Sequence, residues 1–407
     1  MVQMIQLPSD GDSSGRDLGE EELALLKEAI ASGHLTSTRG TMVPRLEEEF
    51  AKVFGVDRAI ALASGSAAVH TAVAAVDPEP GDEVITTPIT DMGAITGILL
   101  QGAVPIFADV DPVSLNVTAE TIRPRITKHT KAIIVTHLFG NPCDMDPILA
   151  LAKEHGIPVI EDAAQAFMAT YKGRLCGTIG DIGCFSFQQS KHMTSGEGGI
   201  VVSNNADYAR RMFLFVNKAW GYGDSNPDHY FLAPNYRMTE LQGAVLVPQL
   251  AKLPGVVERR NRTATRLSNA IAGLSQIQAP VVTPDSKHVY WRYPIRIAAP
   301  GDDLTRLAGA IRERGVQCAP RYISKPAFEC QVIRDRVSFG KSKWPWEGPH
   351  MAGRDPIVYD PKTFPGAYDG LAHVIVIPWN EFFTDDLVDS IAGVIAEAER
   401  NVLGTGV

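Results

Sequence analysis

The chain has 407 residues, of which 45% are hydrophobic and 21% are charged, and its formal net charge is −9. This length and balance predict a globular protein of two or three domains. The sequence has no block of five or more like charges, and its net negative charge argues against a nucleic-acid partner. It also has no run of 18 apolar residues, which a membrane-spanning helix would need.

The N-terminal segment and the cysteines add further expectations. Residues 1–16 are polar and rich in Ser, Gly and Asp, so we expect a loose arm rather than a secretion signal. The five cysteines are widely spaced and form no CxxC pair, which predicts neither a disulfide framework nor a metal site. A reducing cytoplasm is the expected location.

Strands and helices alternate through residues 17–254. After a helix at 18–30, short apolar segments predict strands at 59–63, 83–87, 104–110, 131–138, 157–164, 184–187 and 200–203. The segments between them predict helices at 66–76, 94–101, 146–156 and from Ala206. Strands that are apolar on both faces indicate a parallel sheet covered by helices on both sides. We therefore predict a large, doubly wound α/β domain over 17–254.

Residues 255–407 predict a smaller C-terminal α/β domain. Its boundary falls between two expected helices, at 238–253 and 257–273. The expected elements that follow are a strand at 288–297, a helix at 303–315, a strand at 372–378 and a closing helix from Asp385. Because residues 322–370 are rich in Pro, Gly and aromatics, we expect a long surface excursion there.

A carboxylate and a lysine stand out at the ends of predicted strands. Asp162 ends the strand PVIED, where parallel strands line a ligand crevice, although a helix N-cap would also explain an Asp there. Lys191 lies in FSFQQSKHMTSGEGG (185–199), between a strand and a Gly-rich turn. A partly buried amine has a lowered pKa, and a neutral amine can attack an aldehyde. His192, the next residue, points elsewhere, and we expect it to serve packing.

The segment LASGSAAVH (62–70) combines a strand end, a glycine turn and a helix start. Backbone N–H groups at a helix N-terminus bind phosphate, although a plain capped turn explains the segment equally well. Together, a lysine for an aldehyde, a carboxylate for a ring nitrogen, and amides with hydroxyls for a phosphate are the anchors of pyridoxal 5′-phosphate. The carboxylate would keep the ring nitrogen protonated.

These segments resemble the DegT/DnrJ/EryC1/StrS sugar aminotransferase family of fold-type I pyridoxal-phosphate enzymes. The resemblance runs from about Leu25 to Asn401. It is carried by SGSAAVH (64–70), FADVDPVSLNV (107–117), HLFGNPCDMDPI (137–148), EDAAQA (161–166), GDIGCFSFQQSKHMTSGEGG (180–199) and NYRMTELQGAVLVPQL (235–250).

The resemblance implies a role for each matching residue. Lys191 would hold the cofactor as an imine and shuttle protons, and Asp162 would pair with the ring nitrogen. Gln165 would face the phenolic oxygen of the cofactor. The implied phosphate contacts are Gly65, Ser66, Ser186 and, from the neighbouring subunit, Asn235, and Ala67 is expected as a further cofactor-binding residue. A contact from the neighbour implies a homodimer with shared active sites.

The sequence departs from the family pattern at two places, one expected to contact the cofactor ring and one expected to contact the substrate. Met92 stands where the family usually has an aromatic ring that stacks on the cofactor, and a thioether can also pack on a ring face. RYISKPAF (321–328) replaces the usual Pro-Leu-His turn of the small domain.

The resemblance implies ping-pong transfer of an amino group from glutamate or glutamine to the keto group of a sugar or cyclitol, as in antibiotic biosynthesis. One alternative is a sugar dehydratase on the same scaffold, in which histidine replaces the lysine. The other is a cofactor-binding regulator without turnover. Lys191 favours the aminotransferase. Which ketone is aminated, and whether it is nucleotide-linked, stays open.

Overall fold

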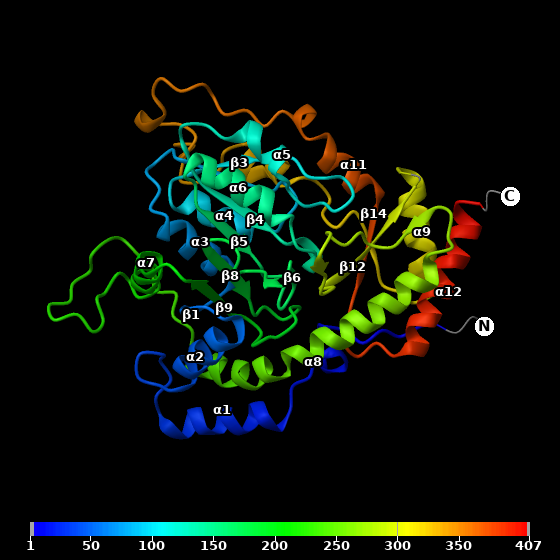
Figure 1. Ribbon diagram of the computed structural model, residues 1–407, viewed down its shortest axis with the longest axis horizontal. Coiled ribbons are helices and arrows are strands. Elements are labelled where there is room, and N and C mark those ends of the chain that lie inside the picture. The colour runs from blue at the N-terminus through cyan, green and yellow to red at the C-terminus, as the bar shows by residue number, and fades with distance from the viewer. Residues whose placement is uncertain (1–3, 299, 405–407) are drawn as a thin grey trace.

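The computed structural model describes residues 4–298 and 300–404, and its larger part is built on a seven-stranded sheet (Figure 1). In spatial order the strands are β1 (Arg58–Leu62), β9 (Gly199–Ser203), β8 (Ile182–Ser186), β5 (Val159–Asp162), β4 (Thr130–Thr136), β2 (Glu83–Thr86) and β3 (Val104–Phe107). Only the two pairings of β9 are antiparallel. The sheet is therefore mainly parallel, as predicted.

Helices cover both faces of this sheet. Successive side chains of β4 alternate between two hydrophobic clusters: Ile133 packs with α6, whereas Ile134 packs with α3 and α7. With both faces buried, the strands need no polar side, which explains their apolar runs. The helices of this part are α1 (Glu20–Ser32), α2 (Met42–Phe54), α3 (Gly65–Ala75), α4 (Gly93–Leu100), α5 (Ala119–Ile122), α6 (Met145–His155) and α7 (Ala206–Val216).

A single long helix, α8 (Glu240–Ile271), replaces the two helices expected at 238–253 and 257–273. Pro248 and Pro254 lie inside it, and each removes a backbone hydrogen bond and usually kinks or ends a helix. Here α8 packs against α1 and α2 at one end and against α12 at the other, so tertiary contacts hold it together (Figure 1). The domain boundary predicted at 254/255 lies inside this helix.

The smaller part contains a four-stranded antiparallel sheet with the order β10 (Ile277–Gln278), β12 (Arg292–Ile297), β14 (Val374–Pro378) and β13 (Ala319–Pro320). Helices α9 (Asp302–Glu313) and α12 (Asp385–Val402) pack with it. The strand expected at 288–297 begins only at Arg292. Before it, Val289 and Trp291 donate their amides to the carbonyls of Gly140 and Phe139, in the turn after β4.

Most of residues 322–370 lie at the surface, as expected, but a few buried aromatic side chains anchor the segment. Phe328, Trp346 and Phe364 are buried in the same hydrophobic cluster as β3 and β4, and the Trp346 indole donates to the Tyr359 hydroxyl. These three aromatic side chains, far apart in the sequence, hold the segment against the large sheet. Its helices are η4 (Ala327–Glu329), α10 (Gln331–Arg334), η5 (Pro349–Met351), η6 (Pro361–Thr363) and α11 (Pro365–His373).

The N-terminal arm is also more ordered than predicted. Within its described part, the Arg16 side chain is only 4% exposed and forms an ion pair with Asp10, so this polar segment is fixed by buried charge rather than loose. Residues 1–3 lie outside the described part of the chain. The remaining elements are η1 (Ser13–Gly15), η2 (Arg123–Arg125), η3 (Leu138–Gly140) and a small sheet of β11 (Ser286–Lys287), β6 (Thr170–Tyr171) and β7 (Arg174–Leu175).

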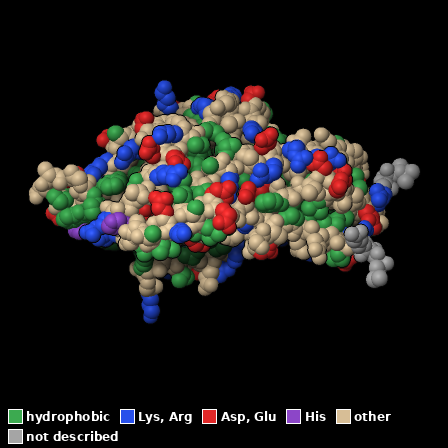
Figure 2. All heavy atoms as spheres, turned by 90° about the horizontal axis from the view of Figure 1, so that it is seen from below, with side chains coloured by type: hydrophobic (Ala, Val, Ile, Leu, Met, Phe, Trp, Pro, Cys, Tyr) green, Lys and Arg blue, Asp and Glu red, His purple; other side chains and the backbone are tan. Residues whose placement is uncertain are grey.

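The surface shows no strong segregation of charge on the face drawn in Figure 2, where acidic and basic side chains are interspersed. Among the described residues, no helix is both long enough and apolar enough to cross a membrane.

Candidate active site

A cavity opens at the carboxyl ends of β1, β5 and β8, which meet at one edge of the sheet. Ligands of open α/β sheets bind at this edge. The empty volume of the cavity is about 1050 Å³, part of which is open to solvent. Its walls are formed by Ser64, Gly65, Ser66, Val69, Thr90, Asp91, Gly93, Ala94, Asp162, Ala164, Gln165, Ser186, Gln188, Ser190, Lys191, Glu197, Trp291 and Tyr322.

Lys191 lies in the connection between β8 and β9, and its Nζ is 4.0 Å from the centre of the Trp291 ring. Burial lowers the pKa of Lys191 to about 8; Asp162 opposes this shift and Arg292 adds to it. An amine with this pKa is partly neutral near physiological pH. It can therefore act both as a nucleophile and as a proton carrier.

Asp162 is the last residue of β5 and is 7% exposed. Its Oδ1 accepts a hydrogen bond of 3.1 Å from the Ala164 amide, whereas its Oδ2 takes part in no hydrogen bond among the described residues. Burial raises the pKa of Asp162, and Lys191 opposes that shift. A buried carboxylate with a free oxygen is a suitable partner for a cationic group inside the cavity.

The N-terminus of α3 provides a binding site for an anion. Ser64 caps the helix by accepting the Ala67 amide at 3.1 Å, and the amides of Gly65 and Ser66 have no partner among the described residues. A Cβ at Gly65 would lie 2.6 Å from the Cβ of Ser186, so only glycine allows this close approach. Free amides and a hydroxyl at a helix N-terminus suit a phosphate.

Gln165 is oriented by its surroundings. Its Oε1 accepts the Phe139 amide at 2.7 Å, and its Nε2 lies 3.4 Å from the hydroxyl of Tyr322. Because Oε1 is occupied by a donor, the NH2 group faces the cavity and can donate to an oxygen of a ligand.

The structure does not bring every predicted residue into the cavity. Met92 does not line it and instead packs against the hydrophobic cluster beneath, while the rings of Trp291 and Tyr322 do line it. The Ala67 amide is occupied by Ser64. Asn235 is exposed and lies outside the cavity of its own chain.

Sequence reasoning missed Trp291 and Tyr322 as site residues. Trp291 lies in HVYWRYPIRI, whose alternation indicated only a strand, and Tyr322 lies in the atypical segment RYISKPAF. An aromatic residue just before a strand is a weak signal. His192, by contrast, is buried with its Nε2 2.9 Å from the carbonyl of Val289, which fits the packing role expected for it.

His137, Glu161 and Cys176 form a buried cluster behind Asp162 whose ligand-type atoms lie within 4.8 Å of one another. Two of its three side chains, His137 and Glu161, are already engaged in several hydrogen bonds. Nε2 of His137 lies 2.8 Å from Glu161, and its Nδ1 accepts the Cys143 amide. Glu161 also accepts the amides of Gly177, Ile179 and Gly180. We therefore assign the cluster to structure rather than to metal binding.

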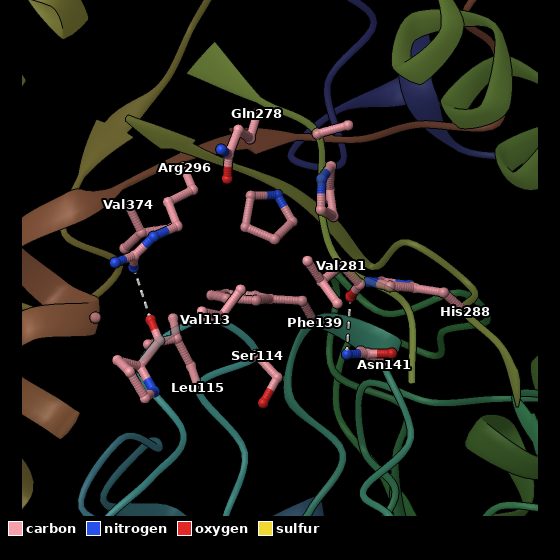
Figure 3. A pocket seen from close by; sticks show the side chains of 15 residues that line it. Val113, Ser114, Leu115, Phe139, Asn141, Gln278, Val281, His288, Arg296 and Val374 are labelled. Atoms are coloured by element: carbon pink, nitrogen blue, oxygen red, sulfur yellow. Dashed lines mark hydrogen bonds between the residues drawn. The ribbon is translucent and has the colours of Figure 1, made fainter. Parts of the chain in front are cut away.

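A second pocket, with an empty volume of about 480 Å³, lies between the two parts of the chain (Figure 3). Its polar groups largely bond to neighbouring backbone: Arg296 donates to the carbonyl of Pro112, and Asn141 donates to that of Val281. It holds no pair of titratable groups arranged for catalysis, so the chemistry is assigned to the cavity that contains Lys191.

The residues of that cavity fit pyridoxal phosphate: unpaired helix amides for the phosphate, an unsatisfied carboxylate oxygen for the ring nitrogen, and an amine for the aldehyde. A mainly parallel α/β sheet with this set of groups at its carboxyl edge defines a fold-type I pyridoxal-phosphate enzyme. Residues 16–345 match the model of the DegT/DnrJ/EryC1/StrS aminotransferase family, and the chain belongs to that family. It is thus a pyridoxal-phosphate-dependent aminotransferase.

Curated and solved relatives agree with this assignment. The chain is 35% identical over 298 residues to the spore coat polysaccharide biosynthesis protein SpsC of Bacillus subtilis, covering 71% of this chain and 76% of that protein. It is 38% identical over 264 residues to GDP-perosamine synthase of Caulobacter vibrioides, covering 64% and 70%. A solved aminotransferase from Psychrobacter cryohalolentis is 29% identical with a TM-score of 0.82, covering 96% of this chain and 99% of that one.

Proposed function

We propose that this enzyme transfers the amino group of glutamate or glutamine to the keto group of a sugar or cyclitol. The observation that carries the proposal is the position of Lys191, whose amine shares one cavity with Asp162 and the free amides of α3. The named relatives in polysaccharide and perosamine synthesis support a sugar substrate, and GDP-perosamine synthase favours a nucleotide-linked one.

Each group in the cavity has a definite task in this proposal. When bound, pyridoxal phosphate withdraws electrons from the substrate Cα as its proton leaves. Lys191 Nζ would attach the cofactor through its aldehyde and, once released, carry the proton from Cα. Asp162 would hold a proton on the ring nitrogen, and Gln165 would donate to the phenolic oxygen. Gly65, Ser66 and Ser186 would bind the phosphate.

The two alternatives are less well supported. A dehydratase of this scaffold carries histidine in place of the lysine, and Lys191 occupies that position here. A regulator without turnover would not need a lysine with a pKa near 8 beside a buried carboxylate, and here both groups line the cavity.

The proposal is tested with purified enzyme and candidate substrates. Glutamate or glutamine should convert the bound cofactor to its amine form, with loss of the imine absorbance. Nucleotide-linked keto-sugars and free ketocyclitols are then added separately, and the active ketone restores the original spectrum. Lys191→Ala is the control. If no donor changes the spectrum of the loaded enzyme, the proposed transamination is wrong.

The pKa of Lys191 leads to a pH prediction. Only the neutral amine attacks an aldehyde, so covalent uptake of pyridoxal phosphate by the apoprotein should rise with pH and reach half its maximum near pH 8. Arg292→Met removes a positive charge that lowers this pKa, so its midpoint should move to higher pH, whereas exposed Arg306→Met should leave it unchanged. Rates are followed by absorbance; a midpoint near 10.5 in the wild type would contradict the lowered pKa.

We also propose a homodimer with shared sites, in which Asn235 reaches the phosphate bound by the neighbouring subunit. Asn235 is exposed, and its Oδ1 accepts the Arg237 amide at 3.2 Å. Its NH2 group has no partner among the described residues and is available to a partner chain. If this is correct, dimerisation and cofactor binding are linked.

Mixing two inactive variants tests this arrangement. In a mixed dimer of Lys191→Ala and Asn235→Ala, one site carries both changes and the other carries neither, so random exchange should restore up to about a quarter of the activity. Activity is measured after subunit exchange has been verified by mass, and each variant alone gives the background. Exchange without recovery of activity would place Asn235 in its own subunit's site.

A further inference from the structure

The N-terminal arm forms a charged cluster that extends across both parts of the chain. The Asp10 carboxylate lies 2.9 Å from Arg16, 2.8 Å from Arg292 and 3.4 Å from Arg260, and it accepts a hydrogen bond from Asn380 at 2.7 Å. Glu381 balances Arg260 at 2.7 Å. Three guanidinium groups thus surround a single carboxylate from the arm.

The same arm contacts the backbone that carries Lys191. Arg16 donates from Nη1 to the carbonyl of Lys191 at 2.8 Å, and the Gln189 side chain donates to the carbonyl of Asp10 at 2.8 Å. On the other side, the indole of Trp291 donates to the carbonyl of Ser190 at 2.8 Å. Two successive carbonyls at the lysine are therefore each fixed by a side chain from a distant segment.

We propose that residues 10–16 form a clasp that positions Lys191 for proton transfer, with Arg16 as its positioning residue. This inference rests on the proposed role of Lys191. The Nζ atom moves with its backbone, and a displacement of about 1 Å in a catalytic group costs up to about a hundredfold in rate. The clasp thus acts on the rate of the chemical step rather than on cofactor affinity.

The arm has the local features that such a clasp requires. A Cβ at Gly15 would lie 2.4 Å from the carbonyl of Ser9 and 2.6 Å from Nδ2 of Asn380, so glycine allows the turn to close against the small domain. Asn380 donates both to Asp10 and to the carbonyl of Gly15. In Figure 1 the arm starts beside α12 and passes α8 before it forms α1, which places it across the junction of the two parts.

The test compares Arg16→Met with Arg16→Lys and with the exposed Arg306→Met on α9. Single-turnover rates of the amine-donor half-reaction are measured for the loaded enzymes, together with cofactor dissociation constants and unfolding midpoints. We expect Arg16→Met to slow the half-reaction by about tenfold to a hundredfold with cofactor affinity changed by less than about threefold. Arg16→Lys keeps the charge and should recover part of the rate, and Arg306→Met should match the wild type.

Hydrogen exchange of the apoprotein gives a readout that does not depend on activity. Amides of residues 188–193 should exchange faster in Arg16→Met, with the core strands unaffected. A lower unfolding midpoint with an unchanged half-reaction rate would show that Arg16 has only a structural role, and the proposed clasp would be wrong. Unchanged hydrogen exchange at residues 188–193 would also contradict the clasp. If the wild type itself shows no half-reaction, the proposed function fails instead, so the two failures are distinguishable.

Discussion

Lys191→Ala should abolish transamination by this enzyme, with a loss of at least about four orders of magnitude in the half-reaction rate. The side chain is expected both to attach the cofactor and to move the Cα proton, and general acid–base catalysis alone contributes about a hundredfold to ten-thousandfold. Cofactor binding should largely survive, because the amides of α3 and the hydroxyl of Ser186 do not depend on the lysine. The rate is measured by stopped-flow absorbance with glutamate or glutamine.

Chemical trapping makes this prediction specific to one residue. Borohydride reduction of the wild-type enzyme should bleach the imine absorbance and leave the cofactor on the peptide that contains Lys191. Lys172→Ala is a suitable control, because the Lys172 side chain is 46% exposed and paired with Asp146. That variant should react at the wild-type rate. A label on another lysine, or a Lys191→Ala rate within tenfold of the wild type, would refute the assignment.

The sheet, and the meeting of Asp162, Lys191 and the N-terminus of α3 in one cavity, could be predicted because each depends on local sequence. Asp162 is the last residue of β5, Lys191 lies in the connection that follows β8, and the free amides of Gly65 and Ser66 follow from a capped helix start. The carboxyl ends of parallel strands always meet at one edge, so local assignments were enough to bring these groups together.

The errors concern features that depend on contacts between distant segments. We expected one helix to end at residue 253 and another to start near 257, but α8 continues through Pro254 and packs on α1, α2 and α12. Trp291 reaches the cavity because its amide is bonded to the turn after β4, about 150 residues earlier. Arg16 looked like part of a loose polar arm because its partners, Asp10 apart, lie far away in the sequence. No local pattern carries such information.

Asp162→Asn should slow turnover by about a hundredfold or more, because it keeps the shape of the side chain and removes the charge that holds the ring nitrogen protonated. It should not impair the attachment of the cofactor. The negative charge of Asp162 raises the pKa of Lys191, so its removal lowers that pKa further and increases the neutral fraction of the amine near pH 7. Loss of turnover with equal or faster covalent uptake is a signature that general unfolding would not produce.

Asp181→Asn provides the matched control for this prediction. Asp181 accepts the Val159 amide at 2.8 Å, near the opposite end of β5, and the same change there removes a carboxylate outside the cavity. Because an asparagine oxygen can still accept that hydrogen bond, turnover per folded molecule should stay close to that of the wild type. Steady-state turnover and cofactor uptake are measured on both variants at pH 7. Near-normal turnover of Asp162→Asn, or an equal loss in Asp181→Asn, would show that the Asp162 charge has no specific part in the reaction.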